Sequence, residues 1–309
     1  MAQTPLQLLA EYGQSPWLSA PPRRIGLDGE LQELVRDHGI KGVTSAGANG
    51  DEAGTDVRQA CDLMRPLWEA SGMRDGYVTL QVDPTLAHDA PRMLAYAKRL
   101  RALIARPNLM VGIPATRAGL EAIESAIAAR VPVEVTRIYS LARYRQVVDA
   151  YARGVERLIG SGGDPAQVAS VAAVQLCPVD AEVDRRLDAI GGDATRLKGR
   201  LAIANARLIY AEYKQAVASP RCLWVAAPVR GCSDVLYVEE LIGSETVVAV
   251  TPETIAAVED HALVADTLER AAAEAPRTFR EIEAAGVDLD DVWRVLEARA
   301  EQATSPVRA

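Results

Sequence analysis

The chain has 309 residues, of which 49% are hydrophobic and 25% charged, and its formal net charge is -8 at pH 7. This composition is typical of a globular protein with a large buried core, and it argues against a disordered or fibrous chain. The negative charge, without a run of basic residues, argues against nucleic acid as a partner, because phosphate binding needs clustered Lys and Arg.

The start of the chain lacks a basic segment followed by an apolar core, and no window approaches the roughly 18 unbroken apolar residues that a membrane span requires. We therefore expect a cytoplasmic protein that does not bind membranes. The four cysteines form no CxxC pair, and the three histidines are far apart in the sequence. We expect no structural zinc site, no disulfide framework and no cofactor.

Short apolar segments rich in β-branched residues alternate along the chain with longer helical patterns. The candidate strands are 15–20, 40–45, 77–82, 109–114, 133–139, 168–176, 222–227 and 246–250. Between most of them, apolar residues recur every three to four positions, as in amphipathic helices.

Strict alternation of strand and helix indicates parallel strands with helical crossovers, and eight such units close most naturally into a (β/α)8 barrel. A doubly wound open sheet is the alternative, but no GxGxxG motif follows the first strand. From Pro252 onward the pattern predicts helices without further strands. We expect residues 1–302 to form one barrel domain with C-terminal helices, and residues 303–309 to form a flexible tail.

Several segments resemble bacterial transaldolases and follow the order of that family. The N-terminal ones are PLQLLAEYGQSPWL, GVTS at 42–45 and ACDLMRPLWEASGMRDGYVTLQVDPTLAHD at 60–89. The later ones are RPNLMVGIPATRAGLEAIE, VTRIYSLARYRQV, GRLAIANARLIYAEYK, SDVLYVEELIG and AGVDLDDVW. By this ordered agreement the chain is identified as a member of the transaldolase family, which implies a TIM barrel of the transaldolase or class I aldolase type.

The resemblance also implies a chemistry, in which a lysine on the fourth strand attacks a ketose phosphate and forms a Schiff base. A desolvated amine can be neutral and nucleophilic at neutral pH, and the iminium it forms accepts electrons during carbon–carbon cleavage. In this chain Gly112 stands at the position of that lysine. We therefore do not expect the ordinary transaldolase reaction.

Other positions that the family uses around its substrate differ as well. By the same resemblance, the strand-one aspartate corresponds to Ser19, the strand-two asparagine to Ala46, and the proton-transferring glutamate of strand three to Gln81. On strand five an asparagine has become Glu134, whereas Thr136 is retained. The reaction centre therefore differs at several positions at once.

The phosphate end and the mouth of the barrel also differ from the family. The Ser-Arg pair of strand six aligns with Cys177 and Pro178, and Arg230 is the only cation left near the phosphate end. A helical stretch after strand two is missing, as is a C-terminal segment that covers the mouth in the family. Both losses should open the pocket.

The four lysines of the chain do not replace the missing one. Lys41 begins strand two at the closed end of the barrel, and Lys98, Lys198 and Lys214 lie on helical patterns that face solvent. A lysine outside the desolvated core stays protonated and is a poor nucleophile.

Residues two apart on a strand share a face, so we expect Glu134 and Thr136 to point into the barrel, with Cys177 on the neighbouring strand. Glu134 and Cys177 would then serve as base and acid on the C-H and C=O groups of a substrate. For Cys177 the alternative is an inert, buried small hydrophobe. For Glu134 the alternative is a structural ion pair with Arg137, Arg143 or Arg230.

The remaining candidates would bind the substrate. We expect Ser19 and Gln81 to orient it by hydrogen bonds, and Gly112 and Thr136 to line its site. Arg230 would hold a carboxylate or phosphate group, and the alternative for it is a solvated loop arginine.

Two functions remain in competition, and a genuine transaldolase that transfers dihydroxyacetone units is a third, less favoured one. The first is a repurposed barrel enzyme that performs acid–base chemistry on a polyol or carbonyl metabolite without a Schiff base, in specialised metabolism; isomerisation, dehydration, cyclisation and non-covalent aldol chemistry all stay open. The second is a pseudoenzyme that binds a metabolite or a protein. Pocket positions changed together while helices and turns stayed family-like, which favours the first. A small-molecule substrate is expected, and the sequence leaves a homo-oligomer open.

Overall fold

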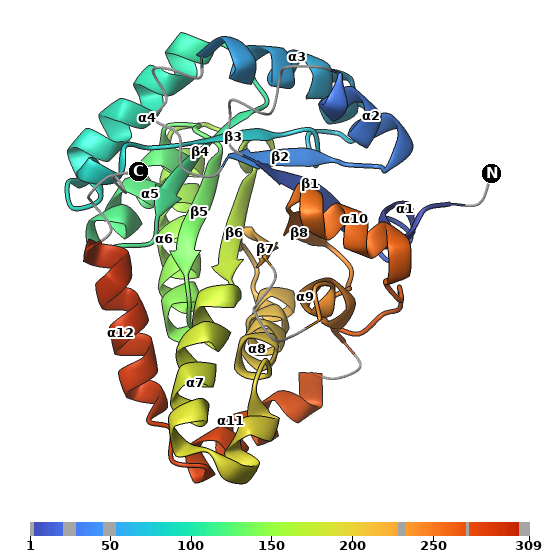
Figure 1. Cartoon of the computed structure of the whole chain (residues 1–309). Coiled ribbons are helices and arrows are strands. Elements are labelled where there is room, and N and C mark those ends of the chain that lie inside the picture. Colours follow the sequence, from blue (N-terminus) through green and yellow to red (C-terminus); the bar gives the residue numbers. More distant parts are fainter. Residues whose placement is uncertain (1–2, 21–28, 46–53, 228–232, 270–271, 303–309) are drawn as a thin grey trace.

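Eight parallel strands form a closed barrel in the computed structural model, which describes residues 3–20, 29–45, 54–227, 233–269 and 272–302 (Figure 1). Each strand pairs with the next along the chain, and β8 pairs with β1. The strands are β1 (Gln14–Ala20), β2 (Gly42–Ser45), β3 (Val78–Gln81), β4 (Leu109–Pro114), β5 (Val133–Ile138), β6 (Ser170–Gln175), β7 (Arg221–Ala226) and β8 (Thr246–Val250). The prediction of a (β/α)8 barrel is confirmed.

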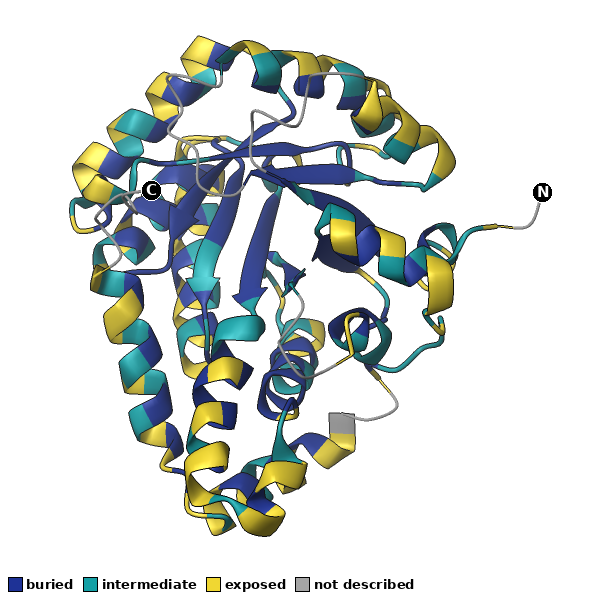
Figure 2. Ribbon diagram, viewed as in Figure 1, coloured by how far each residue is buried: buried dark blue, intermediate teal, exposed yellow. Residues whose placement is uncertain are grey.

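Helices surround the barrel, and their outer faces are exposed while the strands are almost wholly buried (Figure 2). They are α1 (Pro5–Leu9), α2 (Glu30–Asp37), α3 (Gly54–Ala70), α4 (Ala90–Ile104), α5 (Arg117–Ala128), α6 (Leu141–Gly160), α7 (Cys177–Ile190), α8 (Leu201–Gln215), α9 (Leu236–Glu240), α10 (Pro252–His261), α11 (Ala275–Ala284) and α12 (Leu289–Gln302). Within the described ranges, no helix has the length and apolar character needed to cross a membrane. The predicted tail, 303–309, lies outside the described residues.

Polar residues that follow the strands determine where several helices begin. The Thr116, Ser140 and Thr251 side chains accept hydrogen bonds from the backbone N–H of the third residue beyond, at the start of α5, α6 and α10. Such N-caps satisfy amides that have no partner within the helix. Each of these three strands therefore passes into its helix within a few residues, which keeps strand ends and helix starts together at one rim of the barrel.

Large side chains fill the interior of the barrel near the amino ends of its strands. Trp17, Met110 and Leu223 are fully buried there and belong to one cluster. Gly42 lies against the Trp17 indole, and a Cβ at this position would overlap the ring. Below them, Arg221 forms an ion pair with Asp75 at 2.9 Å. This end of the barrel is closed, so any site must open at the carboxyl ends of the strands.

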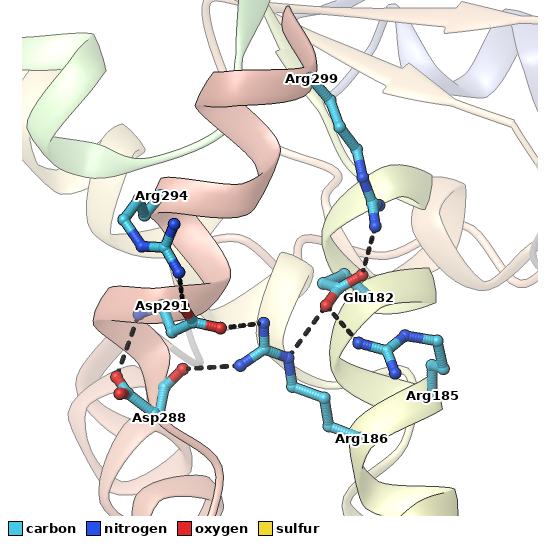
Figure 3. A network of polar contacts seen from close by, with 7 residues as sticks. All are labelled: Glu182, Arg185, Arg186, Asp288, Asp291, Arg294 and Arg299. Carbon is cyan, nitrogen blue, oxygen red and sulfur yellow. Dashed lines mark hydrogen bonds and ion pairs between the residues drawn. The ribbon is translucent and has the colours of Figure 1, made fainter.

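A network of charged side chains joins α12 to α7 (Figure 3). Glu182 on α7, with 2% of its side chain exposed, contacts Arg186 at 3.0 Å and reaches Arg299 of α12 at 3.0 Å. Arg186 also pairs with Asp291 of α12 at 2.7 Å. The final described helix is therefore fixed along the barrel, with its carboxyl end near the mouth, where the Ala300 carbonyl accepts a hydrogen bond from Arg137.

Candidate active site

A cavity of about 380 Å³ opens at the carboxyl ends of the strands. This is the end of a (β/α)8 barrel where active sites lie. Side chains from β1 to β7 contribute to its wall, which consists of Ser19, Thr44, Ser45, Gln81, Val82, Pro84, Pro114, Glu134, Thr136, Arg137, Tyr139, Gln175 and Val225. Ser19, Gln81, Glu134 and Thr136, which the sequence selected as site residues, are therefore brought together. Gly112, which was also expected to line the site, is not part of this wall, because the Gln81 carboxamide lies against it.

Glu134 lies on β5, and only 2% of its surface is exposed. Its Oε1 accepts a hydrogen bond from the Thr44 hydroxyl of β2 at 2.8 Å, and its Oε2 accepts one from the Gln81 amide of β3 at 2.8 Å. Both carboxyl oxygens thus accept hydrogen bonds from β2 and β3, which are separated from β5 by β4. The carboxyl group has one fixed orientation at the edge of the cavity.

Further hydrogen bonds support the Thr44 hydroxyl from below. The Thr79 hydroxyl donates to Thr44 Oγ1 at 3.2 Å, and the backbone N–H of Ser45 donates to Thr79 Oγ1 at 3.2 Å. Thr79 is fully buried and lies beneath the cavity wall. A chain of donors therefore runs from the β2 backbone to the carboxyl group of Glu134.

Gly112 makes room for the contact between Gln81 and Glu134. The strand register aligns Gln81 with Gly112 and Gly112 with Glu134, so the three residues form one row across β3, β4 and β5. A Cβ at Gly112 would overlap the Gln81 carboxamide. The amide of Gln81 thus occupies the space directly above the position where the resemblance expects a lysine side chain.

Burial raises the pKa of the Glu134 carboxyl, and the neighbouring donor groups of Thr79, Thr44 and Gln81 partly oppose this effect. Glu134 makes no ion pair with any described residue. Arg143 pairs instead with Glu297 at 2.9 Å, and Arg137 donates to the Ala300 carbonyl. The structural pairing of Glu134 with Arg143 or Arg137 is therefore not formed. Arg230, the third candidate partner, lies outside the described residues.

The expectation that Cys177 lies on a strand beside Glu134 is wrong. β6 ends at Gln175, and Cys177 is the first residue of α7, where it packs against the core and does not line the cavity. Burial and the neighbouring Asp180 raise the pKa of its thiol. A thiol in this environment is mostly protonated at neutral pH and has little of the reactivity of a thiolate.

Sequence reasoning missed several residues of the wall. Ser45, Gln175 and Tyr139 line the cavity, and the buried hydroxyl of Ser45 has no hydrogen-bond partner among the described residues. Gln175 could have been found from strand alternation, because it lies two residues after the inward-facing Ala173. Its amide and the Ser45 hydroxyl can each donate and accept, and they suit the hydroxyl groups of a ligand.

All four lysines lie away from the cavity. Lys98 is exposed on α4, Lys198 pairs with Asp188 at 2.8 Å, and Lys214 pairs with Glu245 at 3.0 Å. Lys41 precedes β2 at the closed end, where its backbone N–H bonds the Pro16 carbonyl. Across the described parts of the chain, no three His, Cys, Asp or Glu side chains gather as metal ligands.

The fold and this site define a (β/α)8 barrel with a polar pocket at the carboxyl ends of its strands. The family model described as Transaldolase/Fructose-6-phosphate aldolase matches residues 48–303. The chain belongs to this transaldolase family. The resemblance first observed in the sequence segments is thereby confirmed.

Several relatives named transaldolase are similar to the chain over most of its length. One from Saccharopolyspora erythraea is 40% identical, covering 94% of this chain and 91% of the relative. Transaldolase 1 of Streptomyces coelicolor is 39% identical, covering 94% and 89%, and a transaldolase of Acidothermus cellulolyticus is 38% identical, covering 95% and 91%. The first alignment extends over 337 positions, more than the 309 residues of this chain, so that relative contains segments that this chain lacks.

Among solved structures, the chain is similar to the catalytic domain of a hyperthermophilic chitinase from Pyrococcus furiosus. The TM-score is 0.36 and the identity 10%, over 89% of this chain and 97% of that one. This likeness is too weak to bear on fold or function.

Proposed function

We propose that this protein catalyses proton transfer on a small hydroxylated carbonyl compound in the barrel cavity, without forming a covalent imine. One observation carries the proposal: Glu134 is a buried carboxyl at the cavity wall, held on both oxygens by neutral donors and unpaired with any described cation. A buried carboxyl without a counter-ion has a raised pKa and is poised to exchange a proton with a substrate.

The activity in the relatives' name does not fit this cavity. By family resemblance, transaldolase chemistry starts from an amine on the fourth strand, and Gly112 has no side chain to supply one. Gln81 fills the space above Gly112, and the four lysines lie on the outside or at the closed end. By the same resemblance, the covalent electron sink would be absent, and Glu134 places a carboxyl on β5 where the family has an asparagine.

Proton abstraction beside a carbonyl is the step that isomerisation, dehydration and cyclisation have in common. In each, Glu134 would accept a proton from carbon and return it to carbon or oxygen. Ser19, Thr136 and Gln175 line the same cavity and would hold the substrate's hydroxyl groups. Their neutral side chains suit a polyol or hydroxycarbonyl compound more than a second anion beside Glu134.

Exchange of substrate C–H protons in D₂O, followed by proton NMR, tests the proposal. The probes are dihydroxyacetone, fructose and fructose 6-phosphate. We expect the protein to exchange protons beside the carbonyl of at least one probe, Glu134→Gln to lose this exchange, and the exposed control Glu69→Gln to retain it. Exchange that survives in Glu134→Gln would remove Glu134 from the mechanism. Binding of the probes without exchange would support a non-catalytic binding protein instead.

A further inference from the structure

The donor chain beneath Glu134 runs toward the carboxyl group when Glu134 is ionised. The backbone N–H of Ser45 can only donate, so Thr79 Oγ1 is its acceptor and the Thr79 proton is free to point at Thr44. Thr44 Oγ1 accepts that proton, and its own proton then points at Glu134 Oε1. An ionised carboxylate can only accept, so with Glu134 ionised the Thr44 proton points at Oε1, and Thr44 Oγ1 is left to accept from Thr79.

This arrangement acts on the two forms of Glu134 unequally. A donor aimed at a carboxyl oxygen stabilises the ionised form, whereas burial stabilises the neutral form. The pKa of Glu134 is raised because burial is the larger effect, and the hydroxyl donors limit the rise. Without them the group would stay protonated over a wider pH range, and within that range a protonated carboxyl does not accept a proton from a substrate.

Few other charges act on Glu134. Of the described residues that line the cavity, β1, β2, β3, β4, β6 and β7 supply neutral side chains. The only other titratable groups in that wall are Arg137 and Tyr139, which follow Glu134 along its own segment of chain. The hydroxyl chain is therefore the main contact on Glu134 Oε1 that a single substitution can remove without changing charge.

We propose that Thr44, backed by Thr79, is a positioning residue that keeps Glu134 ready to accept a proton from the substrate. This inference rests on the proposed function, because it assigns Thr44 a role in proton transfer through Glu134. Thr44 itself would not exchange a proton with the substrate. Its hydroxyl would hold Oε1 of the carboxyl group. Oε2, which accepts the hydrogen bond from the Gln81 amide, would then be the oxygen on the cavity side.

Two substitutions separate the hydroxyl from the packing of Thr44. Thr44→Val keeps the shape and removes the donor, whereas Thr44→Ser keeps the donor and removes a methyl group. A purely structural role would make the serine variant the more disturbed of the two. A positioning role would make the valine variant the disturbed one, with serine restoring the behaviour of the wild type.

The test is an infrared titration of the Glu134 carboxyl, isolated as the difference between each protein and its Glu134→Gln counterpart. We expect the midpoint for Thr44→Val to move to higher pH than the wild type, the midpoint for Thr79→Val to move in the same direction, and that for Thr44→Ser to stay in place. A Thr44→Val midpoint equal to the wild type, or a Thr44→Ser midpoint that moves as far, would overturn the inference. Should Thr44→Val not fold, as judged by circular dichroism, the Thr79→Val midpoint decides in the same way. The titration needs no substrate, so its outcome is independent of the exchange experiment on the proposed function.

Discussion

Gln81 donates a hydrogen bond to Glu134 at 2.8 Å by reaching across Gly112, the residue between them in the row of three strands. The contact spans β4, and it exists because β4 presents no side chain at this point. This glycine therefore lets an amide orient a buried carboxyl, at the position where the family resemblance expects an amine.

Adding a methyl group at Gly112 should break this contact. A Cβ there overlaps the Gln81 carboxamide, which must move aside and give up its hydrogen bond to Glu134. Leaving a buried polar group without its partner costs about 1–3 kcal/mol of unfolding free energy. We expect Gly112→Ala to lower the unfolding free energy, measured by urea denaturation, by that amount. In a Gln81→Ala background, where the space is free, we expect a smaller loss. An equal loss in both backgrounds would mean that the two side chains do not compete for the space.

The buried carboxyl of Asp180 should make stability depend on pH. Its oxygens accept hydrogen bonds from the Ala202 backbone N–H and the Tyr237 hydroxyl, and burial raises its pKa to about 7 from 3.8. Between these two pH values the folded state binds more protons than the unfolded state, so the unfolding free energy falls as pH rises and levels off above about pH 7.

Asp180→Asn is uncharged throughout and should lack this part of the pH dependence. The measurement is thermal unfolding of both proteins between pH 4 and 8. We expect the midpoint temperature of the wild type to fall relative to that of the variant as pH rises. A constant difference across this range would show that Asp180 does not titrate there.

Substitutions at the centre and at the edge of the network between α7 and α12 should lower the unfolding free energy by very different amounts. Glu182 is buried and contacts Arg185, Arg186 and Arg299. Charge-assisted hydrogen bonds of this kind contribute about 1.5–3 kcal/mol, so we expect Glu182→Ala to lower the unfolding free energy by that amount.

Arg294→Ala is the matched control in the same network. This arginine pairs with Asp291, but 73% of its side chain is exposed, and exposed pairs contribute about 0–1 kcal/mol. Similar losses in the two variants by urea denaturation would contradict the assignment of Glu182 as the centre of the network.

Cys177 should react slowly with alkylating agents. Burial and the nearby Asp180 raise the pKa of its thiol, which lowers the fraction of reactive thiolate. We expect iodoacetamide to modify Cys177 more slowly than free cysteine at pH 7.5, measured by peptide mass spectrometry. Faster modification would indicate an activated thiol, and Cys177 would again be a candidate acid or base.

Local sequence patterns were sufficient for the barrel and for part of the site. β-branched runs predicted all eight strands, and the two-residue period predicted that Glu134 and Thr136 face the same cavity. The same period failed for Cys177, because β6 ends at Gln175 and the chain has turned into α7 before Cys177.

Contacts that depend on barrel closure were beyond sequence reasoning. Thr44 and Glu134 lie 90 residues apart and on strands separated by two others, so their hydrogen bond follows from the curvature of the whole sheet. Arg143 similarly finds its partner, Glu297, on α12. The two-residue period along a strand predicts which face of the sheet a side chain lies on. Its hydrogen-bond partner depends on which distant elements meet at that face.

Borohydride trapping with fructose 6-phosphate, read by intact mass, tests the central claim most directly. Reduction would convert any imine between the sugar and a lysine into a stable adduct. We expect the mass of the protein to remain unchanged, because Gly112 carries no amine and the four lysines lie outside the cavity. A stoichiometric adduct that maps to one of these lysines would contradict the account.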